Sequence, residues 1–230
     1  MKKLVTLVAM MSMLCMVLAG CGTKLAPADE TISALYDLYV KQDAEPIVSL
    51  LGFESEEVAF DAFFAEDVDP EATVNEMVDM FSQMGVEMTE EETQAFTDSM
   101  IGMIDRAECT AEITSEEGDT TVVTLSIKGF DVNEISNTAL ETVTEMVNNM
   151  TEEEALALST DEEAYNDYMK QVVQLFTDGF NAAVVSEEAV EVEVECQKLA
   201  VDNNGKEIVA WLPVDMDGFA SDVEAAVFQQ

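Results

Sequence analysis

Carboxylates and one thiol alternate with valine near the C-terminal end of the chain, in "AVEVEVEC" (residues 189–196). Carboxylates can bind a cation, and a pair of them across a cleft can hydrolyse a glycosidic bond. In an extended strand, however, Glu191, Glu193 and Glu195 point to one side, and the valines and Cys196 point to the other. One wet face and one dry face is the usual pattern of an antiparallel strand. We therefore interpret these glutamates as a solvated face and not as a metal or catalytic site.

The chain contains no histidine. The usual general base, the usual zinc ligand and the histidine of a Ser-His or Cys-His pair are therefore missing from it. No other pair of nucleophile and base stands out in the sequence. We expect a protein without catalysis of its own, with no metal and no cofactor.

A second acidic segment, "PVDMDGFASDVE" (residues 213–224), resembles an EF-hand calcium loop. The residues at loop positions 3, 5, 6 and 12 are Asp215, Asp217, Gly218 and Glu224. Pro213 replaces the first aspartate of that loop, and a strand pattern precedes it where the family has a helix. We therefore predict a turn from strand to helix, in which Asp217 or Ser221 caps the last helix.

The N-terminus begins with a basic head, "MKK", followed by 17 uncharged residues and then by Cys21. This order is typical of a secretory signal peptide, whose apolar segment is too short for an ordinary membrane anchor. The segment "LAGC" (residues 18–21) resembles the lipobox of bacterial lipoproteins. In that family a transferase attaches diacylglycerol to the cysteine thiol, and a peptidase cuts just before the cysteine. The resemblance implies lipidation of Cys21 and removal of residues 1–20.

Residues 21–29 then form a short tether, and residues 30–230 form the globular part. Two acyl chains are enough for stable membrane binding, so we expect a lipid-anchored protein on the extracytoplasmic face of the cell membrane. The alternative is an ordinary signal peptide in which Cys21 stands by chance.

Charge limits the partners of the mature chain. Removal of Lys2 and Lys3 leaves 7 basic residues against 49 acidic ones, a net charge of −42. Nucleic-acid binding needs basic patches, so it is excluded. A basic clamp on anionic lipid is excluded for the same reason, and the lipid remains the only predicted membrane contact. The 48% of hydrophobic residues and the 11 phenylalanines indicate a folded chain despite this charge.

Two thiols, Cys109 and Cys196, remain when Cys15 leaves with the signal peptide and Cys21 carries lipid. Outside the membrane such a pair can form a disulfide. Two separate buried thiols that act as small apolar side chains are the other interpretation. The sequence leaves both open, because it does not give the distance between the Cα atoms.

Periodicity and capping signals predict the elements that hold these residues. Helices are expected at residues 30–42, 46–52, 56–64, about 70–85, 89–104 and 131–149, then from 151 and from the "TDEE" at 160–163. Period-two patterns predict hairpins at residues 107–130 and 189–214, with turns at 117–119 and 203–205, before a short helix from about Phe219. Helices and hairpins are segregated along the chain, so the predicted class is α+β, with amphipathic helices packed on antiparallel hairpins.

The two hairpins align without a gap, and the alignment matches Cys109 with Cys196 and Gly118 with Gly205. A "TV-x-EMV" segment and a "TEEE" precede each hairpin. We predict two pseudo-repeated helix-helix-hairpin halves, at residues 71–131 and 140–219, with chance similarity as the alternative.

The whole chain resembles, in style, the small acidic lipoproteins of low-GC Gram-positive bacteria. We expect a non-catalytic binding or interaction module with an unknown protein or small molecule as its partner. A solute- or cation-binding lipoprotein is the second interpretation, and a carboxylate-based hydrolase is the third.

Overall fold

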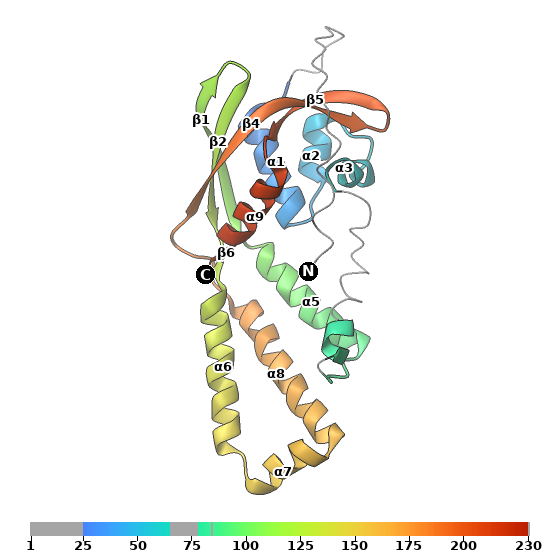
Figure 1. Ribbon diagram of the computed structural model, residues 1–230, viewed down its shortest axis with the longest axis vertical. Coiled ribbons are helices and arrows are strands. Elements are labelled where there is room, and N and C mark those ends of the chain that lie inside the picture. The colour runs from blue at the N-terminus through green and yellow to red at the C-terminus, as the bar shows by residue number, and fades with distance from the viewer. Residues whose placement is uncertain (1–24, 65–77, 84, 230) are drawn as a thin grey trace.

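The computed structural model describes residues 25–64, 78–83 and 85–229. The signal peptide, Cys21 and most of the helix predicted at about 70–85 lie outside these residues. The fold is α+β, as predicted, and it has two parts that lie end to end along the longest axis (Figure 1). We call them the body, which contains the sheet with α1, α2, α3 and α9, and the arm, which contains α5, α6, α7 and α8.

The body is built on a four-stranded antiparallel sheet with the strand order β1-β2-β4-β5. The strands are β1 (Glu108–Glu117), β2 (Thr120–Lys128), β4 (Val190–Asn203) and β5 (Lys206–Pro213). The two predicted hairpins are therefore confirmed, and they join side by side through β2 and β4 (Figure 1). Alternate residues of β2, such as Val123, Leu125 and Ile127, are fully buried on one face of the sheet. That face forms the floor of the main core.

Four helices belong to the body, and α1 and α9 pack against the apolar face of the sheet. The helices are α1 (Ala28–Val40), α2 (Glu45–Leu51), α3 (Glu56–Phe63) and α9 (Met216–Val227). In α1, Ile32, Leu35 and Tyr36 are fully buried, because the spacings i, i+3 and i+4 place them on one side of a helix. As predicted, Pro46 lies in the first turn of α2, and Gly52 ends it with a φ of 74°, a left-handed conformation that glycine adopts freely. The helix α1 begins at Ala28, so the last two residues of the predicted tether are helical.

The arm is a bundle of helices that begin at well-defined N-terminal caps. Its members are α5 (Glu90–Ile104), α6 (Val132–Asn149), α7 (Glu152–Thr160) and α8 (Glu162–Ala182). Thr89 and Thr151 each complete the predicted capping box with the glutamate three residues later. The cap of α8 is Asp161, which accepts hydrogen bonds from the N–H groups of residues 163 and 164, and not Thr160. A second core cluster holds α8 to the preceding segments through Phe81, Val86 and Val173.

Arg106 connects the arm to the body. Its guanidinium donates hydrogen bonds to the carbonyl oxygens of Phe180 at 2.6 Å and Ala183 at 2.9 Å, at the end of α8. The same group lies 5.7 Å from the centre of the Phe130 ring. A cation at a helix C-terminus is favoured by the helix dipole and by the free carbonyl groups there. Arg106 is the only arginine of the chain.

A short parallel pair of strands closes the same joint. Phe130 and Asp131 form β3 (Phe130–Asp131), which pairs with β6 (Phe228–Gln229) just after α9. Gly129 precedes β3, and a Cβ atom at this position would lie 2.1 Å from the carbonyl oxygen of Val227. Its own carbonyl oxygen accepts a hydrogen bond from the N–H of Ser186 at 2.8 Å. The chain can pass between the end of α9 and the segment after α8 because residue 129 has no side chain.

The hairpins do not keep the register that the predicted repeat implies. In the first hairpin Cys109 pairs with Ile127, whereas in the second Cys196 pairs with Pro213, one residue earlier than the alignment requires. A β-bulge between Ile113 and Ser115 interrupts the first hairpin, and the structure records no such shift in the second. The internal repeat therefore stays a prediction based on sequence similarity.

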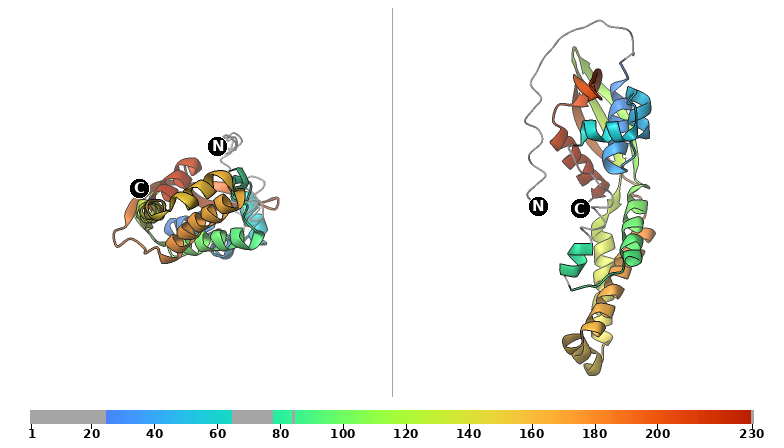
Figure 2. Two further views of the ribbon diagram at one scale, coloured as in Figure 1. Left: turned by 90° about the horizontal axis from the view of Figure 1, so that it is seen from below. Right: turned by 90° about the vertical axis from the view of Figure 1, so that its right-hand side faces the viewer.

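The chain enters the fold at one end of the molecule, and α7 lies at the other end (Figures 1 and 2). The segment that leads into α1 (residues 25–27) enters at the sheet end, where the turn between β1 and β2 also lies (Figures 1 and 2). The helix α7 lies at the opposite end of the long axis in the same views. The arm thus projects away from the point at which the chain enters the body.

Candidate functional site

The glutamates of β4 lie on an open face of the sheet. Glu191, Glu193 and Glu195 are exposed, while Val192, Val194 and Cys196 between them are buried. The interpretation of this segment as a strand with one wet face and one dry face is confirmed. On β2 the neighbouring residues of the wet face are Ser126, Thr124 and Val122.

The wet face also carries acids from the edge strand β1. Glu112 pairs with Thr124, which pairs in turn with Glu193. The two glutamates are thus two strands apart, about 10 Å between their backbones. They stand on an exposed surface in full contact with water, which differs from the walled cleft in which paired carboxylates carry out glycoside chemistry.

The two thiols do not meet. Cys109 and Cys196 are both free, and their pairing partners on β2, Ile127 and Thr121, are six residues apart. With strand β2 between them, the two Cα atoms are separated by roughly 20 Å, far beyond the reach of a disulfide. The candidate disulfide is therefore absent from this fold, and the thiols take the other interpretation, that of separate small apolar side chains.

Burial also makes both thiols unreactive. It raises the pKa of Cys109 to about 12, and the nearby Asp37 carboxylate contributes to this increase. It raises the pKa of Cys196 to about 12 as well, with a smaller contribution from Glu195. Both thiols are therefore protonated at neutral pH. Because the thiolate is the form that acts as nucleophile and metal ligand, they are unreactive there.

The segment that resembles an EF-hand is a turn between β5 and α9. The Asp215 carboxylate accepts a hydrogen bond from the N–H of Gly218 at 3.0 Å and so caps α9. The prediction of a turn from strand to helix is confirmed, but the predicted capping residues, Asp217 and Ser221, are wrong. Both lie inside α9, one and five residues after its first residue. Within the described part of the chain, no group of three His, Cys, Asp or Glu side chains is arranged to hold a metal ion.

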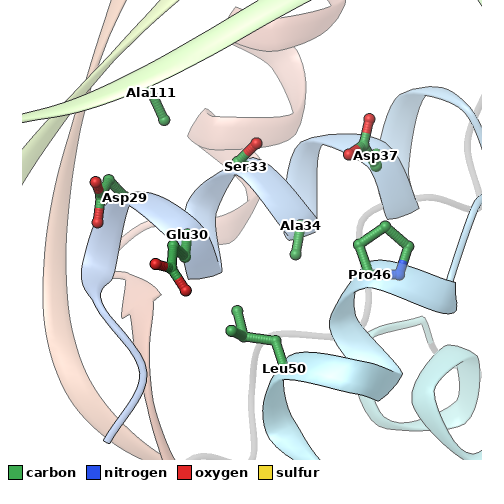
Figure 3. A pocket seen from close by; sticks show the side chains of 8 residues that line it. All are labelled: Asp29, Glu30, Ser33, Ala34, Asp37, Pro46, Leu50 and Ala111. Carbon is green, nitrogen blue, oxygen red and sulfur yellow. The ribbon is translucent and has the colours of Figure 1, made fainter.

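A shallow groove of about 360 Å³ lies between α1, α2 and β1 (Figure 3). Its lining residues are Asp29, Glu30, Ser33, Ala34, Asp37, Pro46, Leu50 and Ala111. Figure 3 shows the Asp29 and Glu30 carboxylates near one end of this set and Asp37 near the other. One oxygen of Asp29, Oδ1, is buried and has no hydrogen-bond partner among the described residues, whereas Asp37 pairs with Lys41 at 3.0 Å. The groove therefore offers a negative, partly desolvated site to a cationic group.

The outward side of α6 presents apolar side chains to water. Leu140 is 57% exposed and Val147 is 53% exposed, and seven residues separate them, so they lie on one side of the helix. A hollow of about 460 Å³ lies beside Leu140, lined by Asn137, Leu140, Glu141, Thr144 and Glu145. This surface was not predicted from the sequence, although an apolar pair at a spacing of seven residues is a signal for it. The inward side of α6, which includes Ala139, already explains the sequence of α6 as that of an ordinary amphipathic helix. The second, outward pair of apolar residues is therefore easily overlooked.

No family model and no curated protein matches this chain. A solved structure with a similar fold is the crystal structure of ycdA from Bacillus subtilis, which is described as a lipoprotein. The TM-score is 0.53 at 16% sequence identity, over 88% of this chain and 56% of the Bacillus protein. The present chain thus spans little more than half of that protein, and the likeness concerns the fold.

None of the helices within residues 25–64, 78–83 and 85–229 combines the length and the apolar character that crossing a bilayer requires.

Proposed function

We propose that this protein is a lipid-anchored lipoprotein on the extracytoplasmic face of the cell membrane and works as a non-catalytic binding module. The "LAGC" segment that ends at Cys21 supports the anchor. The fold supports it at a coarser level, because the similar Bacillus structure is that of a protein described as a lipoprotein.

The placement of the arm carries the binding part of the proposal. Cys21 stands four residues before Leu25, so its lipid lies within about 14 Å of the sheet end of the body. The arm extends from the opposite end of the body (Figure 2). Anchoring therefore holds the sheet near the membrane and directs α7 into the surrounding medium, where the arm can meet a partner.

The substitution Cys21→Ser tests the anchor. It removes the acceptor thiol, so the chain accumulates as uncleaved precursor or leaves the membrane fraction. Cys15→Ser is the matched control, because it changes a cysteine of the same apolar segment and keeps "LAGC" intact. Normal processing and membrane partitioning of the Cys21→Ser protein would contradict the proposal.

Distance from the membrane tests the orientation. A fluorophore on Glu117→Cys marks the β1–β2 turn, and one on Ser159→Cys marks α7. The two native thiols of the mature body react slowly because their pKa is raised, so labelling favours the introduced cysteine. Energy transfer to an acceptor lipid should be strong for the first label and weak for the second. Equal transfer from both sites would mean that the molecule lies along the membrane.

The non-catalytic character rests on the open acidic face and on the two protonated thiols. The pure protein is expected to leave glycan, ester and peptide substrates unchanged. Turnover that a single Asp or Glu substitution abolishes would refute this part of the proposal.

The groove of Figure 3 favours one second candidate, the binding of a cationic solute. The unpaired Oδ1 of Asp29 is the observation behind it. Spermidine and Ca²⁺ are suitable probes, and either should raise the melting temperature of the wild-type protein more than that of Asp29→Asn. An equal shift in both proteins would assign the effect to general screening of the negative charge.

A further inference from the structure

Charge is one-sided on the arm, as it also is over residues 42–105, which contain no lysine or arginine. Residues 129–169, which include all of α6 and α7, contain 11 acidic residues and no lysine or arginine. Lys128 and Lys170 are the nearest cations along the chain, and both pair with glutamates, Glu108 at 3.5 Å and Glu92 at 3.0 Å. The surface of α6 therefore has a negative potential that its own neighbours in sequence do not neutralise.

The exposed apolar residues of α6 run beside a row of acids. Leu140 and Val147 form what we call the outer stripe, and Glu134, Glu141 and Glu145 form the acidic row. At 100° per residue the row lies roughly 100–140° around the helix from the stripe. The hollow lies between them, since Leu140, Glu141 and Glu145 all line it. A ligand seated in the hollow would touch apolar carbon on one side and carboxylates on the other.

We infer that the outer stripe and the acidic row of α6 form the docking surface for a basic amphipathic helix of another protein. This inference rests on the proposed function, since it names the partner of the binding module. Such a helix places its apolar side chains on Leu140 and Val147 and its lysines or arginines on the acidic row. The 18 residues of α6 offer about 27 Å of contact along its axis.

Charge complementarity selects this occupant over two others. A second copy of the chain would bring two acidic rows together, and their repulsion opposes association. An anionic bilayer repels the same row, because membrane-surface helices need basic residues on their polar face. A cationic partner gains from both the stripe and the row.

The test uses the lipidated protein in vesicles of zwitterionic phosphatidylcholine. The probe is a fluorescent 18-residue peptide of Leu, Lys and Ala, with Leu on one helical face and Lys beside it. A second peptide has the same composition in an order without an apolar face, and a third has Glu in place of Lys. Fluorescence anisotropy should rise for the first peptide alone, and only when the vesicles carry the protein.

Two pairs of variants locate the binding. Leu140→Asn with Val147→Asn should raise the half-saturating concentration about tenfold, because two half-exposed apolar side chains lose their contacts. Val209→Asn on β5 is the matched control, since Val209 is also 57% exposed, and it should leave binding unchanged. Glu141→Gln with Glu145→Gln should weaken binding about threefold at low salt and flatten its salt dependence. The same double change at Glu191 and Glu193 on the sheet should do neither.

Several outcomes overturn the inference. Equal binding to empty vesicles would assign the peptide to the bilayer. Equal affinity for the wild-type protein and the variants in α6 would move the site elsewhere on the chain. A dimer that Leu140→Asn with Val147→Asn dissociates, without capture of the peptide, would make a second copy the occupant. None of these results touches the anchor, whose failure appears in the fractionation of Cys21→Ser.

Discussion

Two glycine-to-alanine substitutions should change stability in opposite directions. Gly129 stands at the joint between body and arm, and an added Cβ would lie 2.1 Å from the oxygen and 2.6 Å from the carbonyl carbon of Val227. Both contacts are to backbone, so a side-chain rotation cannot relieve them. Gly102 lies near the end of α5, and no atom of the described residues lies within 4 Å of the position its Cβ would take.

The magnitudes follow from these contacts. Gly129→Ala forces the end of α9 away by more than 1 Å and strains the pairing of β3 with β6, so we expect a loss of about 3 kcal/mol. Gly102→Ala removes backbone freedom from a helix and adds no clash, so we expect a gain of about 0.5–1 kcal/mol. In a domain of this size each kcal/mol corresponds to roughly 2–4 °C in the melting temperature.

Urea unfolding provides the assay. Trp211 is the only tryptophan, and at 9% exposure it reports on the body by fluorescence, while circular dichroism at 222 nm reports on all helices. The wild-type protein and both variants are compared under the same conditions. If Gly129→Ala has the same midpoint of urea unfolding as the wild-type protein, the close approach of residue 129 to Val227 is wrong. If Gly102→Ala is destabilised as much as Gly129→Ala, the effect belongs to alanine in general and not to the joint.

The remaining predictions concern the arginine, the thiols and a helix cap. Arg106→Met should cost about 1–2 kcal/mol and speed hydrogen exchange at the end of α8, whereas Arg106→Lys should keep part of the effect; unchanged exchange in Arg106→Met would contradict this role. Folding raises the pKa of Cys109 and Cys196 to about 12, so their contribution is complete below about pH 8.5 and is lost as the pH rises toward 12. The urea midpoint should therefore fall between pH 8 and 11, and less steeply in the double alanine variant; equal slopes would refute this origin. Thr151→Ala should cost about 1 kcal/mol, seen as faster exchange in α7 with that of α5 unchanged, and equal exchange in both proteins would show that the cap is dispensable.

Local signals in the sequence predicted most of the elements. Proline, glycine and the two capping boxes act within a few residues, so Pro46, Gly52 and Thr89 could be interpreted without knowledge of the fold. Errors arose where two neighbouring residues could do the same work. Asp161 caps α8 in place of Thr160, and the sequence could not decide between them because aspartate and threonine are both favoured at the N-cap.

Contacts between distant segments could not be predicted in this way. Matching positions of Cys109 and Cys196 in the alignment suggested that the thiols meet, but the order of strands in the sheet puts β2 between them. The arm was missed for a similar reason. The helices α6 and α8 pack on one another, since a Cβ at Gly179 of α8 would lie 2.9 Å from Ile135 of α6. Periodicity cannot distinguish this packing from packing on the sheet.

The pairing of β3 with β6 has a consequence for the order of folding. Phe228 pairs with Phe130, although the whole arm and the second hairpin lie between them in the chain. A chain emerges from its N-terminus onward, so residues 228 and 229 become available only after the arm and the second hairpin. The helices of the arm depend on contacts closer in sequence and can form earlier. Until residues 216–229 have emerged, Phe130 lacks its partner strand and Gly129 has no α9 against it. A chain cut just before Phe228 would therefore keep the helices of the arm but leave the joint open, with the Phe130 side chain exposed to quality-control proteases.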